Sequence, residues 1–126
     1  MEATWSNILD GWEYGNFVNG RKDGVWKVWY ESGVPLGFIQ YKNGMLHGEA
    51  REYAEDTGSL LETKTFYNNE NKGIKMYYPE KDYDKLPDEA KKIFDPLSKK
   101  EPLIKEFFND IPIGAKSFKP MPRQIK

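Results

Sequence analysis

The chain of 126 residues contains no cysteine and only one histidine, His47. Without cysteine the protein can form neither disulfides nor thiolate metal sites, and thiol catalysis is excluded. Long hydrophobic runs are also missing, since no stretch approaches the ~18 apolar residues that a membrane helix requires. The N-terminal segment carries acidic residues and no long apolar run, so it does not have the form of a secretory signal. These absences predict a cytoplasmic protein.

A strong net charge is also lacking, because the total is −1, but the charges are unevenly distributed. Residues 1–84 hold 9 basic and 14 acidic residues, whereas residues 85–126 hold 10 basic and 6 acidic residues. This asymmetry indicates two regions with different roles, or two regions that attract each other within one molecule. Aromatic residues make up 15% of the chain, which predicts a folded domain rather than a disordered one.

A turn-like motif occurs three times in the first 78 residues. NGRKDG at 19–24 is followed by NGMLHG at 43–48 and NNENKG at 68–73, at spacings of 24 and 25 residues. A period of this length is typical of repeat architectures. Aromatic residues keep fixed distances from the motifs in two columns, namely Phe17, Tyr41 and Phe66 before them and Trp29, Tyr53 and Tyr78 after them.

Each unit predicts a β-hairpin, because Asn-Gly favours a tight turn in which glycine takes positive φ without steric cost. The glycine that closes each motif, at positions 24, 48 and 73, predicts a backbone site that excludes a Cβ atom. Strand alternation places Trp26, Val28 and Tyr30 on one side and Trp29 on the other. We expect a mainly β protein in which stacked antiparallel hairpins extend one elongated sheet. Both aromatic columns are expected in its core, and the face of Trp29, Tyr53 and Tyr78 is the better candidate for a continuous one.

The region after Tyr78 loses the repeat. Pro87-Asp88-Glu89 predicts a helix that runs to Phe94 and stops at Asp95-Pro96. Ser98 to Glu101 has the spacing of a capping box, and apolar residues from Leu103 to Ile111 then recur at helical spacing. The sequence therefore divides into a hairpin-repeat region at 1–84, a cap of one or two helices at 85–111 and an extended basic, proline-containing tail at 112–126.

Units of the form Tyr-x-Asn-Gly-x-x-x-Gly-x-x-x-x-Tyr resemble MORN repeats, in the divergent variety seen in bacterial antitoxin-like repeat proteins. YKNGMLHGEAREY at 41–53 fits best, FVNGRKDGVWKVWY at 17–30 fits well, and FYNNENKGIKMYY at 66–78 is degenerate. A partial unit, GWEYG, precedes them at 11–15. The resemblance implies stacked hairpins and a scaffold or binding role, with lipid binding proposed for some members. It also implies no catalysis unless an enzyme is fused.

No group of residues in the chain dictates a chemistry. His47 lies beside Gly48, and the other units place Asp23 and Lys72 there, so we interpret it as a surface turn residue and not a catalytic base. We interpret three acidic pairs as solvated surface, namely Asp82/Asp84, Asp88/Glu89 and Glu55/Asp56. The sequence predicts no enzyme, no cofactor and no metal site.

Trp26 and Tyr30 are the distinctive aromatic residues, because the second unit replaces them with Ala50 and Ala54. They predict either a docking patch for a partner or a surface that packs under the C-terminal helix. The tail supplies the other candidate partner contacts, Lys116, Lys119, Arg123 and Lys126. Four charges without a set of recognition aromatic residues between them, in a chain of pI near 5.9, are only a weak signal of nucleic-acid binding.

These features lead to the hypothesis of a non-enzymatic protein-interaction module. It would be antitoxin-like and would bind a protein effector through the repeat sheet and the tail. The alternative is a structural subunit that assembles with copies of itself in a virion or filament. A membrane surface is only weakly indicated as a partner, and no small-molecule substrate is expected.

Overall fold

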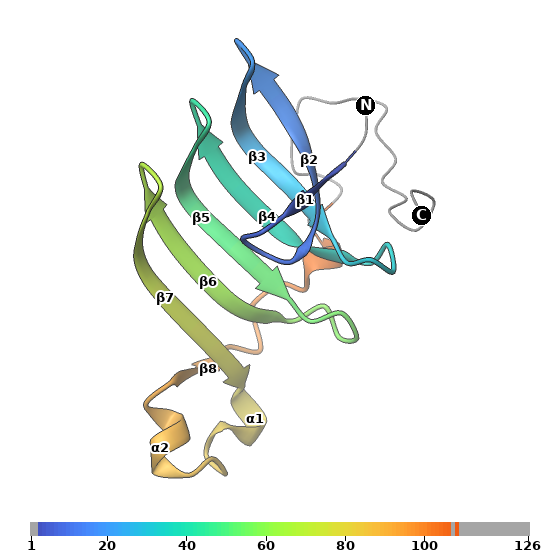
Figure 1. Cartoon of the computed structure of the whole chain (residues 1–126). Helices are drawn as coiled ribbons and strands as arrows, with labels where there is room; N and C mark the ends of the chain where they lie inside the picture. The colour runs from blue at the N-terminus through green and yellow to red at the C-terminus, as the bar shows by residue number, and fades with distance from the viewer. Residues whose placement is uncertain (1–2, 107, 109–126) are drawn as a thin grey trace.

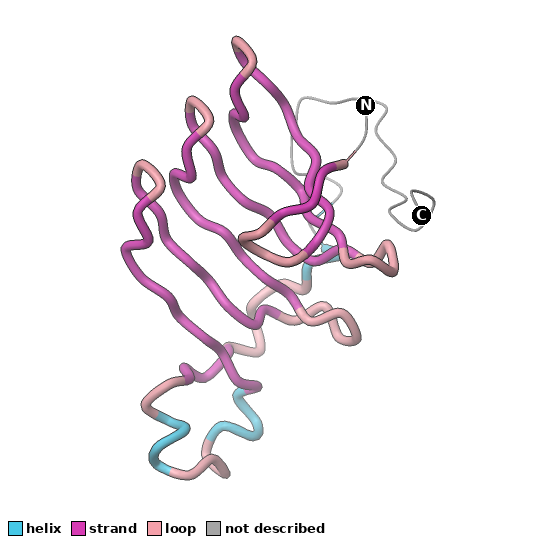
Figure 2. Tube along the Cα trace, in the orientation of Figure 1, coloured by secondary structure: helices cyan, strands magenta, loops and turns pink. Residues whose placement is uncertain are grey.

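The computed structural model describes residues 3–106 and 108, and it contains one eight-stranded sheet whose strand order follows the chain (Figures 1 and 2). All neighbouring strands are antiparallel except the last pair, which is parallel. This arrangement confirms the expected mainly β fold of consecutive hairpins. The strands are β1 (Thr4–Ser6), β2 (Gly11–Val18), β3 (Arg21–Trp29), β4 (Pro35–Lys42), β5 (Met45–Tyr53), β6 (Leu60–Tyr67), β7 (Glu70–Pro79) and β8 (Phe94–Leu97).

The three repeated motifs form the turns of the β2–β3, β4–β5 and β6–β7 hairpins. Both central residues of each turn have positive φ, from 52° and 76° at Asn19-Gly20 to 46° and 72° at Asn68-Asn69. Only Gly and Asn or Asp adopt this turn at low cost, which explains the sequence pattern. Backbone and side-chain hydrogen bonds also join neighbouring tips: Asn69 N–H donates to Leu46 O over 2.9 Å, and Leu46 N–H donates to Asn69 Oδ1 over 2.8 Å.

The closing glycines behave differently in the three units. Gly24 and Gly48 lie where β3 and β5 bulge, and their φ angles are 79° and 108°. The expectation of a glycine site is thus confirmed at these two positions. It is wrong at Gly73, where φ is not positive and an added Cβ would meet no atom within 4 Å. In β7 the residue without a partner is Lys72 instead, so Gly73 pairs with Thr65 in the regular ladder.

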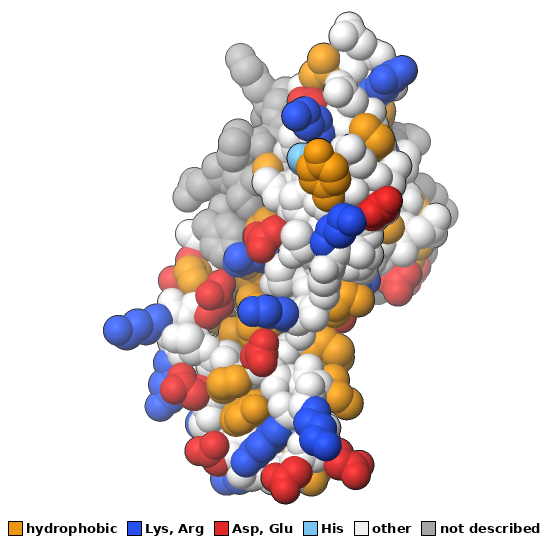
Figure 3. Space-filling view, turned by 90° about the vertical axis from the view of Figure 1, so that its left-hand side faces the viewer, with side chains coloured by type: hydrophobic (Ala, Val, Ile, Leu, Met, Phe, Trp, Pro, Cys, Tyr) orange, Lys and Arg blue, Asp and Glu red, His pale blue; other side chains and the backbone are white. Residues whose placement is uncertain are grey.

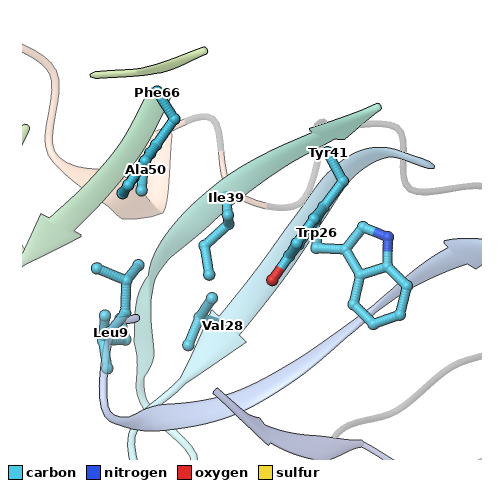
Figure 4. Packing of buried hydrophobic residues seen from close by; sticks show 8 residues of the cluster. Leu9, Trp26, Val28, Ile39, Tyr41, Ala50 and Phe66 are labelled. Carbon is cyan, nitrogen blue, oxygen red and sulfur yellow. The ribbon is translucent and has the colours of Figure 1, made fainter. Parts of the chain in front are cut away.

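Both faces of the sheet carry a hydrophobic cluster. The first face holds Leu9, Trp26, Val28, Leu36, Ile39, Tyr41, Ala50 and Phe66, seen at close range in Figure 4. The β1–β2 turn lies over this face, where Leu9 joins the cluster and Ile8 O accepts a hydrogen bond from Lys64 Nζ over 3.3 Å. The second face holds Ala3, Tyr14, Trp29, Tyr53, Leu60, Ile104 and Phe108.

The aromatic column predicted as the core is therefore only part of it. Trp29 and Tyr53 are buried on the second face. Tyr78 is only half-buried and packs edge-on against Phe94 of β8, at 5.5 Å between ring centroids. In the other column, which is also predicted to be core, Tyr41 and Phe66 are buried on the first face, whereas Phe17 is 49% exposed and that prediction is wrong. The core is therefore divided between the two faces of the sheet.

The predicted C-terminal helices are mostly wrong in extent. Helix α1 spans Glu80–Tyr83 and α2 spans Asp88–Lys91, so the helix expected from Pro87 to Phe94 has a single turn. Phe94–Leu97 instead forms β8, parallel to the end of β7, with Pro96 on the outer edge where its missing N–H has no ladder role. A parallel return needs a crossover, which α1 and α2 supply.

The second expected helix is a 3₁₀ turn at Ile104–Glu106, and the remainder of that prediction except Phe108 lies outside the described residues. The N–H of Lys100 donates a hydrogen bond to the hydroxyl of Ser98 over 3.1 Å and closes a turn there. Ile104 N–H donates to Gly58 O over 2.9 Å, and Ile104 is buried. The first N–H groups of a helix have no partner within the helix, and Gly58 O satisfies this group at Ile104, the first residue of the 3₁₀ turn. Within the described residues no helix has the length and apolarity needed to cross a membrane.

Candidate interaction site

Trp26, the more distinctive of the two predicted contact residues, belongs to the core. Its side chain is 2% exposed and its ring packs edge-on against Phe17 and Tyr41, at centroid distances of 5.1 and 5.7 Å. The indole Nε1–H donates to Asn16 O over 3.1 Å. Both sequence interpretations of Trp26 are therefore corrected: it offers no surface ring, and the C-terminal segment packs on the opposite face, against Trp29.

A glycine explains why Trp26 occurs in one unit only. A Cβ added at Gly15 would lie 2.3 Å from Cγ of Trp26, so the indole occupies the space that a side chain at position 15 would fill. Counting 24 residues onward, the second unit has Ile39 and Ala50 at these two positions, and they face each other across β4 and β5. The first two units thus each pair one large residue with one small residue, which keeps the core filled.

A buried carboxylate that sequence reasoning missed lies next to Trp26. Glu13 is 3% exposed, accepts a hydrogen bond from Tyr41 Oη over 2.8 Å and pairs with Lys22 Nζ at 3.2 Å. The Lys22 ammonium also lies 4.8 Å from the centroid of the Trp26 ring. Burial, followed by the charge of Glu13, raises the pKa of Tyr41 well above its usual range. The group is internally paired, so its role is structural.

Tyr30, the second predicted contact residue, is half-buried at the rim of a surface pocket. Its hydroxyl donates to Tyr53 O, and burial raises its pKa from 10.0 to about 12, with further contributions from Glu52, Glu55 and Asp56. The ring also packs against the first-face cluster. Tyr30 therefore links the core to the surface.

The pocket beside Tyr30 has a volume of about 410 Å³ and is lined by Trp5, Asp10, Tyr30, Glu31, Ser32 and Glu55. We call it the acidic pocket. Its residues come from β1 and from the β1–β2, β3–β4 and β5–β6 connections, which the antiparallel order brings to the same end of the sheet (Figure 1). Trp5 is 43% exposed and packs edge-on against Trp12 at 5.3 Å, so its ring is held in place while one side faces solvent.

The carboxylates at this end of the sheet form no ion pair among residues 3–106 and 108. None of Asp10, Glu31, Glu52, Glu55 and Asp56 takes part in an ion pair of the described chain. Ser32 Oγ donates to Glu55 Oε2 over 2.5 Å and fixes that carboxylate. Burial, and then the charge of Glu62, raises the pKa of Glu52, with Lys64 opposing. The accumulated negative charge favours a cationic ligand.

The remaining candidates are distributed elsewhere. Lys116, Lys119, Arg123 and Lys126 lie outside the described residues. His47 lies within β5 and not in the turn as expected, half-buried, with its ring 4.9 Å from that of Tyr67. Within the described chain no cluster of three or more His, Asp or Glu side chains could hold a metal ion.

Sequence reasoning missed the acidic pocket because its carboxylates are spread over 45 positions, from Asp10 to Glu55. The available signal was the repeat itself, since Glu31 and Glu55 each come two residues after the aromatic residue of their unit, Trp29 and Tyr53. Comparison with known proteins finds no matching family model, no matching curated protein and no matching solved structure.

Proposed function

We propose that this protein is a non-enzymatic interaction module whose acidic pocket binds a basic segment of a partner protein. The observation that carries the proposal is the exposed, fixed ring of Trp5 beside carboxylates that form no ion pair in the described chain. A lysine or arginine side chain of the partner would be held by Glu31 and Asp10 and would lie against the indole, because cations are attracted to tryptophan faces.

The repeat fold supports this role. The sheet of hairpins is a support whose β1–β2, β3–β4 and β5–β6 connections present side chains together at one end. The resemblance to MORN repeats of antitoxin-like proteins adds a protein effector as the class of partner, and cytoplasmic action accords with a chain that has no cysteine.

The structural-subunit alternative has less support. Strand β7 pairs with β6 on one side, but along Glu70–Lys75 its outer side has no neighbour in the described chain, because β8 pairs only with residues 76–79. This open edge carries Lys72 and Lys75, contains a bulge, and has the Gly73 N–H bonded to Asn71 Oδ1 at 2.9 Å. Figure 3 shows charged side chains of both signs on this side of the molecule. Such features protect an edge from pairing with another copy.

The test is binding of an unstructured peptide of alternating arginine and glycine, measured by calorimetry and by tryptophan fluorescence. We expect saturable binding that weakens as salt rises, and no binding of the corresponding glutamate–glycine peptide. The double variant Asp10→Asn/Glu31→Gln should weaken binding about tenfold, since each exposed ion pair contributes about 0.7 kcal/mol.

The matched control is Asp82→Asn/Asp84→Asn, which removes the same charge near α1, away from the pocket. Equal weakening by the two double variants would mean attraction to net charge alone and would reject the pocket as the site. A variant that ends at residue 111 belongs in the series because the tail carries basic residues. Tighter peptide binding after truncation would identify the tail as a competitor for the pocket.

A further inference from the structure

A second hollow lies on the second face of the sheet, the face that buries Tyr53, and shares no residue with the acidic pocket. Its volume is about 370 Å³, and we call it the β5–β7 groove. Two rows of directly facing residues form its floor: Arg51, Thr63 and Lys75 in one row, and Glu49, Thr65 and Gly73 in the next. Gly73 has no side chain to fill the space, and Tyr77 lines the groove alongside.

The floor of the groove contains a hydroxyl without a partner. Thr63 is 8% exposed, and its Oγ1 has no hydrogen-bond partner among the described residues. An unpaired buried hydroxyl destabilises the folded state, so native proteins rarely keep one without a ligand or water to satisfy it. Because Thr63 lines the groove, a ligand seated there can supply the missing hydrogen-bonding group once the hydroxyl turns toward it.

The charges of the groove indicate that this ligand is neutral. The guanidinium of Arg51 is held by Glu49 at 3.2 Å and by Glu101 at 3.3 Å, so its charge is already balanced. With Lys75 included, the two cations Arg51 and Lys75 are balanced by the two carboxylates Glu49 and Glu101. An anionic ligand gains little from such a site, whereas a molecule with several hydroxyl groups can donate to carboxylates and accept from cations at once.

We propose that the β5–β7 groove binds a saccharide of one or two pyranose rings. Its hydroxyl groups bond to Thr63, Glu49 and Lys75, and its C–H face lies against Tyr77. The volume of the groove is within the range of small-molecule sites, and the mixture of an aromatic ring with a few fixed polar groups is typical of them. This binding is independent of the interaction at the acidic pocket.

The test is an NMR titration of the whole chain with glucose, galactose, mannose, N-acetylglucosamine, lactose and maltose. At least one sugar should give saturable amide shifts at Thr63, Thr65 and Lys75. Thr63→Val and Tyr77→Leu should each weaken that binding about five- to tenfold, the loss expected for one hydrogen bond or one ring contact. Unchanged amide spectra away from the groove show that both variants are folded.

The matched control is Lys72→Gln, which changes a lysine on the same strand outside the groove and should leave the sugar affinity unaltered. Titrations with acetate and inorganic phosphate complete the design. Saturable shifts with an anion but with none of the sugars would overturn the proposal, and so would no shift with any sugar. Equal binding by wild type and Thr63→Val would also overturn it.

Discussion

The exchange of side-chain volume between Gly15 and Trp26 makes a sharp prediction for Gly15→Ala. The new methyl group would lie 2.3 Å from Cγ, 2.4 Å from Cδ1 and 2.5 Å from Cδ2 of the indole. Real carbon atoms do not approach so closely, so the ring must leave its position. Moving it breaks the hydrogen bond to Asn16 and disturbs the edge-on contacts with Phe17 and Tyr41.

The magnitude follows from these losses. Overpacking of a core costs about 1–3 kcal/mol, a displaced hydrogen bond adds about 1 kcal/mol, and each aromatic pair contributes about 0.5–1.5 kcal/mol. The terms overlap, so we expect about 3 kcal/mol. For a chain of this size the midpoint of thermal unfolding should fall by roughly 10–15 °C. Urea unfolding followed by circular dichroism and tryptophan fluorescence measures the change directly.

The control is Gly73→Ala, because that glycine has no positive φ and a Cβ there meets no atom within 4 Å. It should change stability by about 0.5 kcal/mol or less. A second check is the cycle with Trp26→Ala, in which Gly15→Ala should cost almost nothing once the indole is absent. If Gly15→Ala is as mild as Gly73→Ala, or if the two changes are additive, the account of Trp26 is refuted.

Three further predictions concern polar groups. Glu13→Gln keeps an acceptor for Tyr41 but leaves Lys22 beside a neutral amide, so urea unfolding should show a loss of about 1–2 kcal/mol that Glu13→Asp does not rescue. Burial raises the pKa of Tyr30 from 10.0 to about 12, so the folded state keeps the phenol proton to higher pH. The free energy of unfolding, measured in urea at several pH values, should therefore fall as pH rises through this interval. Tyr30→Phe should reduce this fall at the expense of the bond to Tyr53 O. Thr63→Val removes an unpaired buried hydroxyl and should raise the free energy of unfolding by about 1 kcal/mol, whereas Thr65→Val, on the exposed neighbour, should have little effect.

Local backbone chemistry made the hairpins predictable. The Asn-Gly pairs require positive φ at both residues, and the structure has those angles at Asn19-Gly20 and Asn43-Gly44. Such turns depend on two adjacent residues and need no knowledge of the rest of the chain. The same holds for the alternation in β3, where Val28 and Trp29 lie in clusters on opposite faces.

Distant contacts were not predictable in this way. The size of Trp26 is meaningful only beside Gly15, which is eleven positions earlier and on another strand. The helical spacing after Leu103 indicated a longer helix, but Ile104 packs against the second face and bonds to Gly58, which the sequence pattern does not encode. The acidic pocket depends on three connections meeting at one end of the sheet, and therefore on the complete strand order.

The agreement between strand order and chain order has a consequence for how the protein folds. From β1 to β7 every strand pairs with its nearest neighbours in sequence, so each hairpin closes a short loop at little entropic cost. Low contact order of this kind favours fast folding, and growth can begin at any hairpin and spread to the next through the bonds between the turn tips. Strand β8 is the exception, because it pairs in parallel with β7 and can add to the sheet only after β7 has formed. We therefore expect it to dock last and, in hydrogen exchange, to open first.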